Sequence, residues 1–350
     1  MSAVPESRLP ARVALAAAGS LAGLLLLEAF CRVAPFQGVR LESFRVEEAA
    51  SPFLGVISRP KRRGFYRASD LLGYEHEENA AGFTNRHGMT GREHPLAKAP
   101  GTFRVLLMGD SIAEPHWAGD SLEDELGRSP ECRKVHERFE VWNAGVGSYD
   151  VRRYGLYLRQ RAARYSPDLI VLFIAMNDFG LDTNTYYKKR DGFIGYHFPL
   201  ESLRRRGFIP SARLLRRSAL YRCVLLRADT WLAARDPGRE ADAGATGRRY
   251  MREILAAARA LPAPIVFVVF PYLTPEAARD ERQRAEYAAI TSVLGAEGTR
   301  RLDLSPLFAD LRRQDFPLRY KPEDVVHPSP AAYRRISREI GAFLVREKML

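Results

Sequence analysis

Ser111, His327 and Asp324 are three residues whose types and spacing could together catalyse acyl transfer. Ser111 lies in the stretch GDSI (residues 109–112), directly after an apolar run. A serine hydroxyl attacks a carbonyl carbon once a base removes its proton. His327 is such a base, and Asp324 could orient its ring and stabilise the imidazolium. Each motif alone is also typical of an ordinary helix cap or surface pair, so the case depends on their joint occurrence.

Two further stretches could supply hydrogen-bond donors to an oxyanion. Asn177 lies in AMND (residues 175–178), and its side-chain amide could donate. The small residues of NAGVGSY (residues 143–149) would let a backbone N–H, that of Gly147 or Ser148, approach a reacting oxygen. Turns after strands often contain the same residue types, so both stretches could also be simple connections.

The elements that must position these groups follow from the alternation of short apolar runs with amphipathic segments. We predict strands at residues 103–109, 139–145, 168–176, 264–270 and 299–305. We predict helices at residues 151–165, 244–261, 275–295 and 330–346. This alternation indicates a three-layer α/β/α sandwich with a mainly parallel five-stranded sheet. The carboxyl ends of parallel strands share one edge, where α/β folds bind ligands.

In combination, the four motifs resemble the sequence blocks of the SGNH/GDSL hydrolase family, over roughly residues 100–346. The resemblance implies that Ser111 is the nucleophile and also an oxyanion donor through its backbone N–H. It implies that Asn177 is a second donor, that His327 is the base oriented by Asp324, and that no cofactor is required.

The chain departs from the family pattern at two positions. Ser148 stands where the family usually has glycine, and Ala175 stands where it usually has glycine before the asparagine. A backbone N–H survives the first change, so the donor role could pass to Ser148 or to Gly147. Beside the reacting groups, we expect Asp110 and Asp178 to brace their loops rather than to react.

The N-terminal stretch Val13–Cys31 is apolar and follows two arginines, Arg8 and Arg12. Its length suits a transmembrane helix, and the preceding positive charges favour a cytoplasmic N-terminus. We therefore predict a membrane anchor with the catalytic domain on the periplasmic side. A cleaved signal peptide or a lipoprotein signal on Cys31 are the alternatives, although the flanking residues suit neither well. This anchor and the stretch at residues 85–95 resemble a bacterial membrane-tethered subgroup of the family.

These patterns predict three regions of the chain. Residues 1–34 form the anchor, residues 35–100 form an extension or linker packing on the catalytic domain, and residues 101–350 form that domain. An arginine-rich insertion interrupts it at about residues 181–243. The insertion could bind an anionic glycan or a phospholipid headgroup, or could simply be a solvated basic face.

Composition narrows the class of protein. The 350 residues carry a formal net charge of +12 from scattered arginines, and no zinc-finger or RNP-type motif accompanies them, so we predict no nucleic-acid partner. Three cysteines are present without a CxxC pair; Cys132 and Cys223 could pair after export, or remain thiols. His87 and His94 lack an evident third ligand, so we predict no metal.

The expected function is that of a serine esterase acting on a small acyl ester of an envelope glycan or lipid. An O-acyltransferase on exported polysaccharide would use the same acyl-enzyme, because only the nucleophile that releases the acyl group differs. A non-catalytic glycan- or lipid-binding envelope protein is a third possibility. The sequence does not predict the oligomeric state.

Overall fold

A five-stranded sheet forms the centre of the larger of two compact units. Its strands, in the order β13-β12-β9-β7-β8, all run parallel to their neighbours. They are β7 (Thr102–Met108), β8 (Arg138–Asn143), β9 (Leu169–Ala175), β12 (Ile265–Phe270) and β13 (Arg301–Asp303). Every residue of β7 and β9 is buried, as expected for parallel strands covered on both faces. The predicted parallel five-stranded α/β fold is confirmed.

This computed structural model describes residues 9–33, 35–36, 39–40, 45–47, 55–57, 65–69, 71–178, 185–188, 194–198, 200–233, 235, 237–296 and 298–350. The larger unit comprises residues 62–182, 188–192 and 238–350. The smaller unit comprises residues 1–61, 183–187 and 193–237. Each unit is described below by itself, and the predicted domain boundaries at residues 34 and 100 stay predictions.

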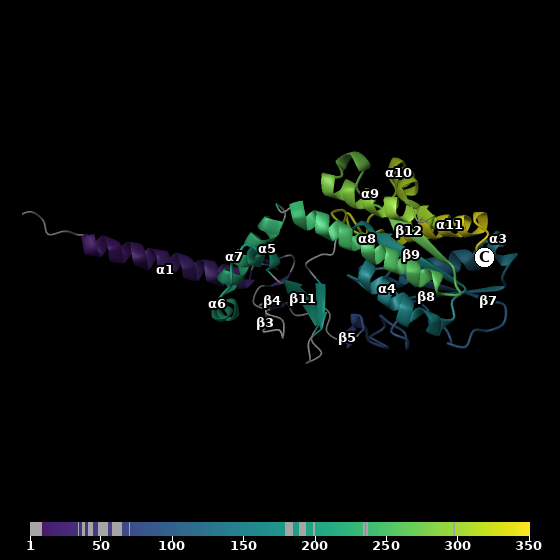
Figure 1. The fold of residues 1–350 in the computed structure, drawn as a ribbon, viewed down its shortest axis with the longest axis horizontal. Helices are drawn as coiled ribbons and strands as arrows, with labels where there is room; N and C mark the ends of the chain where they lie inside the picture. Colours follow the sequence, from purple (N-terminus) through teal and green to yellow (C-terminus); the bar gives the residue numbers. More distant parts are fainter. Residues whose placement is uncertain are drawn as a thin grey trace, which may run out of the picture. The chain divides into compact units, whose positions relative to one another are not determined.

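Helices cover both faces of the sheet (Figure 1). One face shares a hydrophobic core with α2 (His116–Arg128), α3 (Pro130–Arg133), α10 (Ser305–Arg313) and α11 (Pro330–Arg346). Against the other lie α4 (Val151–Gln160), η2 (Ala162–Tyr165) and α8 (Pro237–Arg259). α4 and α8 run side by side, with Gly155 so close that a Cβ there would lie 3.6 Å from Ile254 Cγ1. The helix α9 (Glu281–Ala296) packs near the carboxyl end of β9.

Local signals explain where the key helices begin. The Asp150 side chain accepts the Arg153 N–H at 3.0 Å and caps α4. Ser329 caps α11 in the same way, accepting the Ala332 N–H at 3.1 Å, and Pro330 follows at the first helical position. This cap ends the loop that carries His327, so the base is placed immediately before a buried helix.

A β-hairpin precedes the sheet in the larger unit. It consists of β5 (Tyr66–Ser69) and β6 (Gly73–His76), which pair antiparallel. Tyr74 and His76 of β6 are buried. The predicted extension thus contributes ordered, buried side chains to the unit that holds the sheet.

The smaller unit joins the N-terminal helix α1 (Leu9–Val33) to part of the predicted insertion. Its other helices are α5 (Glu201–Arg205), α6 (Ala212–Arg217) and α7 (Ala219–Ala233). Its four-stranded sheet has the order β10-β11-β4-β3, formed by Thr185–Lys188, Ile194–Phe198, Gly55–Ile57 and Arg45–Glu47; β1 (Pro35–Phe36) and β2 (Val39–Arg40) form a separate pair.

The start of α7 is capped by a carboxylate from α1. The Glu28 side chain accepts hydrogen bonds from Ser218 Oγ at 2.7 Å and from the Ala219 and Leu220 N–H groups, each at 2.9 Å. A negative charge at a helix N-terminus is favourable because unpaired N–H groups and the helix dipole meet there. Glu28, the single acidic residue of the apolar stretch, therefore caps a helix of this unit.

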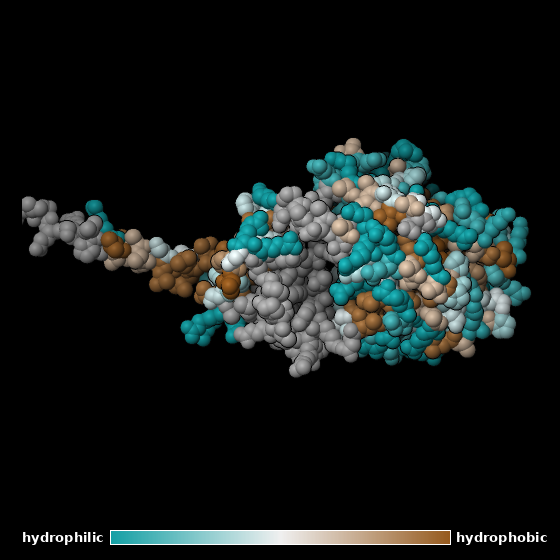
Figure 2. All heavy atoms as spheres, in the orientation of Figure 1, coloured by the Kyte–Doolittle hydropathy of each residue, from teal (hydrophilic) through white to brown (hydrophobic). Residues whose placement is uncertain are grey.

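The helix α1 is apolar and exposed along most of its length. Residues Arg12–Val33 have a mean hydropathy of 2.0 over the most apolar window, and none of that window is buried. Figure 2 shows these side chains as a band of hydrophobic residues. The helix is long and apolar enough to cross a membrane, and a signal sequence would have the same properties.

The three cysteines are free thiols. Cys132 is buried in the core of the larger unit. Cys31 is buried in the hydrophobic cluster of the smaller unit, and Cys223 packs against that cluster. The sequence left open whether Cys132 and Cys223 form a disulfide. In the structure both are unpaired thiols.

Candidate active site

Ser111 lies in a tight turn at the carboxyl end of β7. Glycine is required before it, because a Cβ on Gly109 would lie 2.8 Å from Ala113 Cβ and 3.0 Å from Phe173 Cβ. The Asp110 carboxylate accepts the Ile112 N–H at 2.9 Å, which closes the turn. Asp110 is buried, and its supporting role stays a prediction.

His327 contacts Ser111 across 216 residues of sequence, and Asp324 contacts His327. Ser111 Oγ lies 2.9 Å from His327 Nε2, and His327 Nδ1 lies 2.8 Å from Asp324 Oδ2. The second contact assigns the Nδ1 proton to the side of Asp324, which leaves Nε2 free to accept the serine proton. The structure thus brings together three side chains that the sequence singled out, in the hydrogen-bonded order that serine activation requires.

Backbone hydrogen bonds keep Asp324 ionised beside the histidine. Its Oδ1 accepts the N–H groups of Val326 and His327, both at 2.9 Å. Partial burial raises the pKa of Asp324, but these backbone bonds and the His327 ring outweigh it, so the pKa is lowered from its ordinary value. The carboxylate is therefore available to stabilise an imidazolium.

A hydrogen bond from α11 also holds the turn of Ser111. Tyr333, which is buried, donates from its hydroxyl to the Ile112 carbonyl at 2.5 Å. Since α11 begins just after His327, this bond couples the helix that follows the base to the turn of the nucleophile. The sequence offered no signal for it, because Tyr333 reads only as a core position of an amphipathic helix.

The loop after β8 is fitted tightly against the turn of Ser111. Asn143 donates from its amide to the carbonyl of Ala113 at 2.7 Å and accepts the Gly145 N–H at 3.0 Å. Gly145 must lack a side chain, because a Cβ there would lie 2.5 Å from the Ala113 carbonyl carbon. The predicted small-residue loop therefore approaches Ser111 as closely as backbone allows.

The two candidate backbone donors in this loop differ in their partners. The Gly147 N–H donates to Glu114 Oε1 at 2.9 Å. Ser148 has the left-handed conformation, with φ of 63°, that glycine adopts most easily. Among the described residues, no acceptor is found for the N–H of Ser148 or of Ser111. This arrangement favours Ser148 over Gly147 as an oxyanion donor.

Glu114 is the residue that sequence reasoning missed. Its Oε1 accepts three hydrogen bonds: from Gly147 N–H, from Tyr66 Oη at 2.6 Å and from His76 Nε2 at 3.0 Å. Burial raises the pKa of Glu114, but the His76 ring, the Tyr66 hydroxyl and the Gly147 amide outweigh it, so the pKa is lowered. Only its place three residues after Ser111 could have drawn attention to it.

The hairpin also holds the other side of the same loop. Tyr74 donates from its hydroxyl to the Gly147 carbonyl at 2.6 Å, and Tyr149 donates to the Tyr74 carbonyl at 2.6 Å. Both groups of the Gly147 backbone are therefore bonded to residues outside the loop. The conformation of the loop depends on the hairpin as much as on β8.

Asn177 follows β9, which pairs with β7 in the sheet. Its backbone lies in the short helix η3 (Met176–Asp178), while its side chain is outside the described part of the structure. Asp178 is buried and accepts the Ala175 N–H at 2.7 Å and the Tyr154 hydroxyl at 3.0 Å. Burial and the nearby Asp110 raise the pKa of Asp178 well above its ordinary value. The donor role of Asn177 stays a prediction.

Among the described residues, no group of three or more His, Cys, Asp or Glu side chains could hold a metal ion. His87 and His94 instead lie near the Trp142 ring, with centroids at 5.0 Å and 6.0 Å from it. His94 Nε2 also lies 2.8 Å from Glu123 Oε2, and His87 Nε2 lies 3.2 Å from the His94 carbonyl oxygen.

The arrangement can activate a serine hydroxyl beside backbone N–H groups that have no described acceptor. Such a site can attack a carbonyl carbon and hold the oxygen on which negative charge develops.

Residues 107–335 match the family described as "GDSL-like Lipase/Acylhydrolase family". No curated protein matches the chain.

Several solved structures are similar to this one. The acetylxylan esterase Axe2 from Geobacillus stearothermophilus is 13% identical, with a TM-score of 0.44 over 69% of this chain and 94% of that one. LAE5, an α/β hydrolase from the metagenome of Lake Arreo, Spain, is 15% identical, with a TM-score of 0.43 over 71% and 96%. The acetyl xylan esterase AlAXEase is 10% identical, with a TM-score of 0.42 over 69% and 98%.

The matched family segment contains both Ser111 and His327 and spans more than half of the 350 residues. The chain therefore belongs to the GDSL-like lipase/acylhydrolase family, whose members are carboxylic ester hydrolases.

Proposed function

We propose that this protein is a serine esterase in which Ser111, His327 and Asp324 form the catalytic triad. The observation that supports this most directly is the continuous contact from Ser111 Oγ to His327 Nε2 (2.9 Å) and from His327 Nδ1 to Asp324 Oδ2 (2.8 Å). His327 takes the serine proton as Ser111 Oγ bonds to the ester carbonyl carbon. It then returns the proton to the leaving alcohol as the carbon–oxygen bond breaks. Water attacks the acyl-enzyme by the same route and releases the acid.

We assign the oxyanion donors to the N–H groups of Ser111 and Ser148, together with the Asn177 amide. The first two are supported by their lack of an acceptor among the described residues. Gly147, the other candidate from the sequence, donates its N–H to Glu114, so its role in this proposal is to hold the loop. Removing one such donor typically costs about 10²- to 10³-fold in kcat.

The substrate in this proposal is a small acyl ester of an envelope glycan or lipid. The His327 side chain is 38% exposed, so the base can reach an ester carried by a large alcohol at the surface. The apolar helix α1 supports a place at the membrane. In this proposal the helix is an uncleaved anchor, and the ester hydrolase domain lies on the periplasmic side.

The test is covalent labelling of the purified full chain in detergent with a fluorophosphonate probe. We expect wild type to be labelled, and Ser111→Ala and His327→Ala to lose at least 99% of the labelling rate while keeping their melting temperature. Ser121→Ala and His136→Ala are matched controls outside the triad and should be labelled like wild type. Labelling that persists in Ser111→Ala, or a folded wild type that is never labelled, would overturn the assignment.

A chain-length series then addresses the acyl group. We expect hydrolysis of p-nitrophenyl acetate to exceed that of the octanoate by at least tenfold in kcat/KM. Equal or greater activity on the octanoate would reject a small acyl group while leaving the serine mechanism intact.

A further inference from the structure

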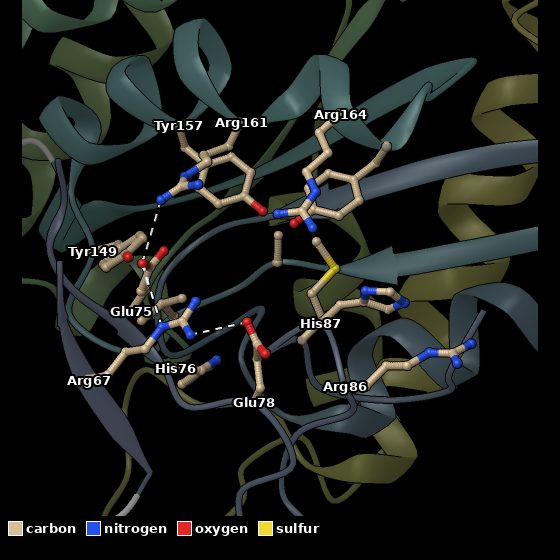
Figure 3. A pocket seen from close by; sticks show the side chains of 15 residues that line it. Arg67, Glu75, His76, Glu78, Arg86, His87, Tyr149, Tyr157, Arg161 and Arg164 are labelled. Atoms are coloured by element: carbon tan, nitrogen blue, oxygen red, sulfur yellow. Dashed lines mark hydrogen bonds and ion pairs between the residues drawn. The ribbon is translucent and has the colours of Figure 1, made fainter. Parts of the chain in front are cut away.

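A polar cavity of about 120 Å³ lies in the larger unit, and its lining does not include the triad (Figure 3). The hairpin β5–β6 contributes one wall and the α4–η2 segment contributes the opposite one. Ala144 and Val146, which flank Gly145, line it as well, so the cavity lies against the loop that carries Ser148. Its volume is several times the roughly 15 Å³ that one water molecule needs.

Six of the fifteen residues that line the cavity are arginines or glutamates. Four arginines, at positions 67, 86, 161 and 164, face only two glutamates, at positions 75 and 78. Arg67 lies 3.1 Å from Glu78 and 3.6 Å from Glu75, and Arg161 lies 3.6 Å from Glu75. The two glutamates are thus shared with two of the arginines. The cavity therefore carries an excess of positive charge.

The remaining arginines are not equivalent. Arg86 pairs at 3.1 Å with Glu93, which is outside the lining. Arg164 lies over the Tyr165 ring at 6.0 Å, and no carboxylate partner is found for it within the described part of the chain. Figure 3 shows Arg161 and Arg164 reaching into the cavity from the same wall. Guanidinium groups in this arrangement are suited to bind oxyanions through paired hydrogen bonds.

Two buried nitrogen atoms of the lining have no hydrogen-bond partner among the described residues. They are Arg161 Nε and His76 Nδ1. The His76 residue is only 2% exposed, and its other nitrogen is bonded to Glu114. Because buried polar atoms are nearly always hydrogen-bonded, two such atoms in one cavity indicate a bound ligand, and the Arg161 Nε–H requires that this ligand supply an acceptor. His76 Nδ1 can donate to the same ligand where both ring nitrogens carry protons, because Nε2 is bonded to Glu114.

We propose that this cavity binds a small oxyanion, a carboxylate or a phosphate group, through Arg161, Arg164 and His76. The site is separate from the ester site, and the proposal does not depend on the reaction assigned to Ser111. A free anion and an anionic group on a larger molecule would present the same chemistry to these three side chains.

The test is isothermal titration calorimetry of the full chain in detergent with inorganic phosphate and, separately, with acetate, using sodium chloride at matched ionic strength as the control. We expect saturable binding of at least one oxyanion and no heat of binding with chloride. Phosphate alone would assign the site to phosphate groups, and acetate alone would assign it to carboxylates.

Two variants locate the binding. We expect Arg161→Gln and Arg164→Gln each to raise the dissociation constant at least tenfold, because each removes charge-assisted hydrogen bonds. Arg159→Gln makes the same change of charge on the neighbouring surface and should bind within twofold of wild type. Arg164 is exposed, so its variant provides the test if Arg161→Gln fails to fold. Equal heats with chloride, or unchanged binding in Arg164→Gln, would overturn the proposal.

Discussion

At the scale of single residues, Glu114 holds several groups of the site in place, although it does not react in the proposed mechanism. One carboxylate oxygen holds the Gly147 N–H, the Tyr66 hydroxyl and the His76 ring. The charged form of a carboxylate accepts such bonds roughly twice as strongly as a neutral acceptor does. The orientation of the Ser148 N–H is thus determined by a residue that never touches the substrate in the proposed reaction.

We predict that Glu114→Gln lowers kcat on p-nitrophenyl acetate about tenfold or more while KM changes little. The neutral amide holds the Gly147 loop less firmly, and a tenfold loss corresponds to about 1.4 kcal/mol of transition-state stabilisation. Glu123→Gln is the matched control, because Glu123 is also partly buried and accepts a backbone N–H, from Val141 at 2.8 Å, away from the loop. Equal losses of kcat in both variants would point to general destabilisation.

The same residue gives a prediction about pH. Because the folded-state pKa of Glu114 is below its ordinary value of 4.5, its contribution to stability is complete above that pH. It is lost as the pH falls through the folded-state pKa. We expect wild type to exceed Glu114→Gln by about 1–3 kcal/mol in free energy of unfolding at pH 7. Urea unfolding followed by near-UV circular dichroism should show this difference shrinking below pH 4.5; a constant difference would contradict the assignment.

At the scale of elements, the site depends on how closely two βα loops approach one another. Gly145 of the β8 loop touches Ala113 and Glu114 of the β7 turn, where a Cβ would lie at 2.5–2.6 Å from backbone atoms. The parallel register of β7 and β8 brings these loops to one edge of the sheet. Neither loop could move without displacing the other.

We therefore predict that Gly145→Ala lowers kcat at least 100-fold in a protein that still folds. The added methyl must displace the turn of Ser111, and a shift of about 1 Å in a catalytic group can cost this much. Gly127→Ala is the control, since a Cβ there would meet nothing within 4 Å. Fluorophosphonate labelling rates and melting curves of both variants are the measurements. Wild-type labelling by Gly145→Ala would show that this contact does not position Ser111.

A buried ion pair fixes the opposite end of the same strands. Arg104 of β7 is fully buried and binds Glu140 of β8 at 2.8 Å. Its guanidinium also donates to the carbonyls of Leu96 and Tyr165. The arginine therefore connects the segment before the sheet and the end of η2 to the two strands. The apolar pattern of β7 gives no indication of this buried charged contact.

At the scale of the whole molecule, the apolar helix α1 is long enough to cross a membrane. The 22 residues Arg12–Val33 of α1 span about 33 Å at 1.5 Å per residue, which matches a hydrocarbon core of about 30 Å. Glu28 near its end is bonded to the start of α7, so part of the insertion is built around this helix. That contact supports our proposal that α1 is an anchor retained after export.

We predict that the full-length polypeptide stays in the membrane fraction after alkaline carbonate extraction. Mass spectrometry should find the N-terminal segment intact, and a C-terminal alkaline phosphatase fusion should be active because that enzyme requires the periplasm. A mature chain that begins after the apolar stretch would assign the segment to a cleaved signal peptide. An intact chain with an inactive fusion would place the C-terminal body on the cytoplasmic side.

The sequence by itself determined the sheet and the three side chains that meet at its edge. Strand runs such as residues 168–176 are nearly all apolar because both faces are covered, and this leaves a strong local signal. Ser111, Asp324 and His327 were found because each stands in a short motif beside such an element. The family match covers residues 107–335, a range that contains these three side chains.

Only the tertiary structure decided how the loops around Ser111 are held. The bonds from Glu114 to His76 and from Tyr74 to Gly147 join residues 38 and 73 positions apart. Contacts of this kind leave no periodic pattern and no characteristic spacing in the sequence, because they depend on how a hairpin packs against a sheet rather than on either segment alone. For the same reason the sequence could not predict that Glu28 caps α7, nor that several arginines and a buried histidine line a cavity behind the loop.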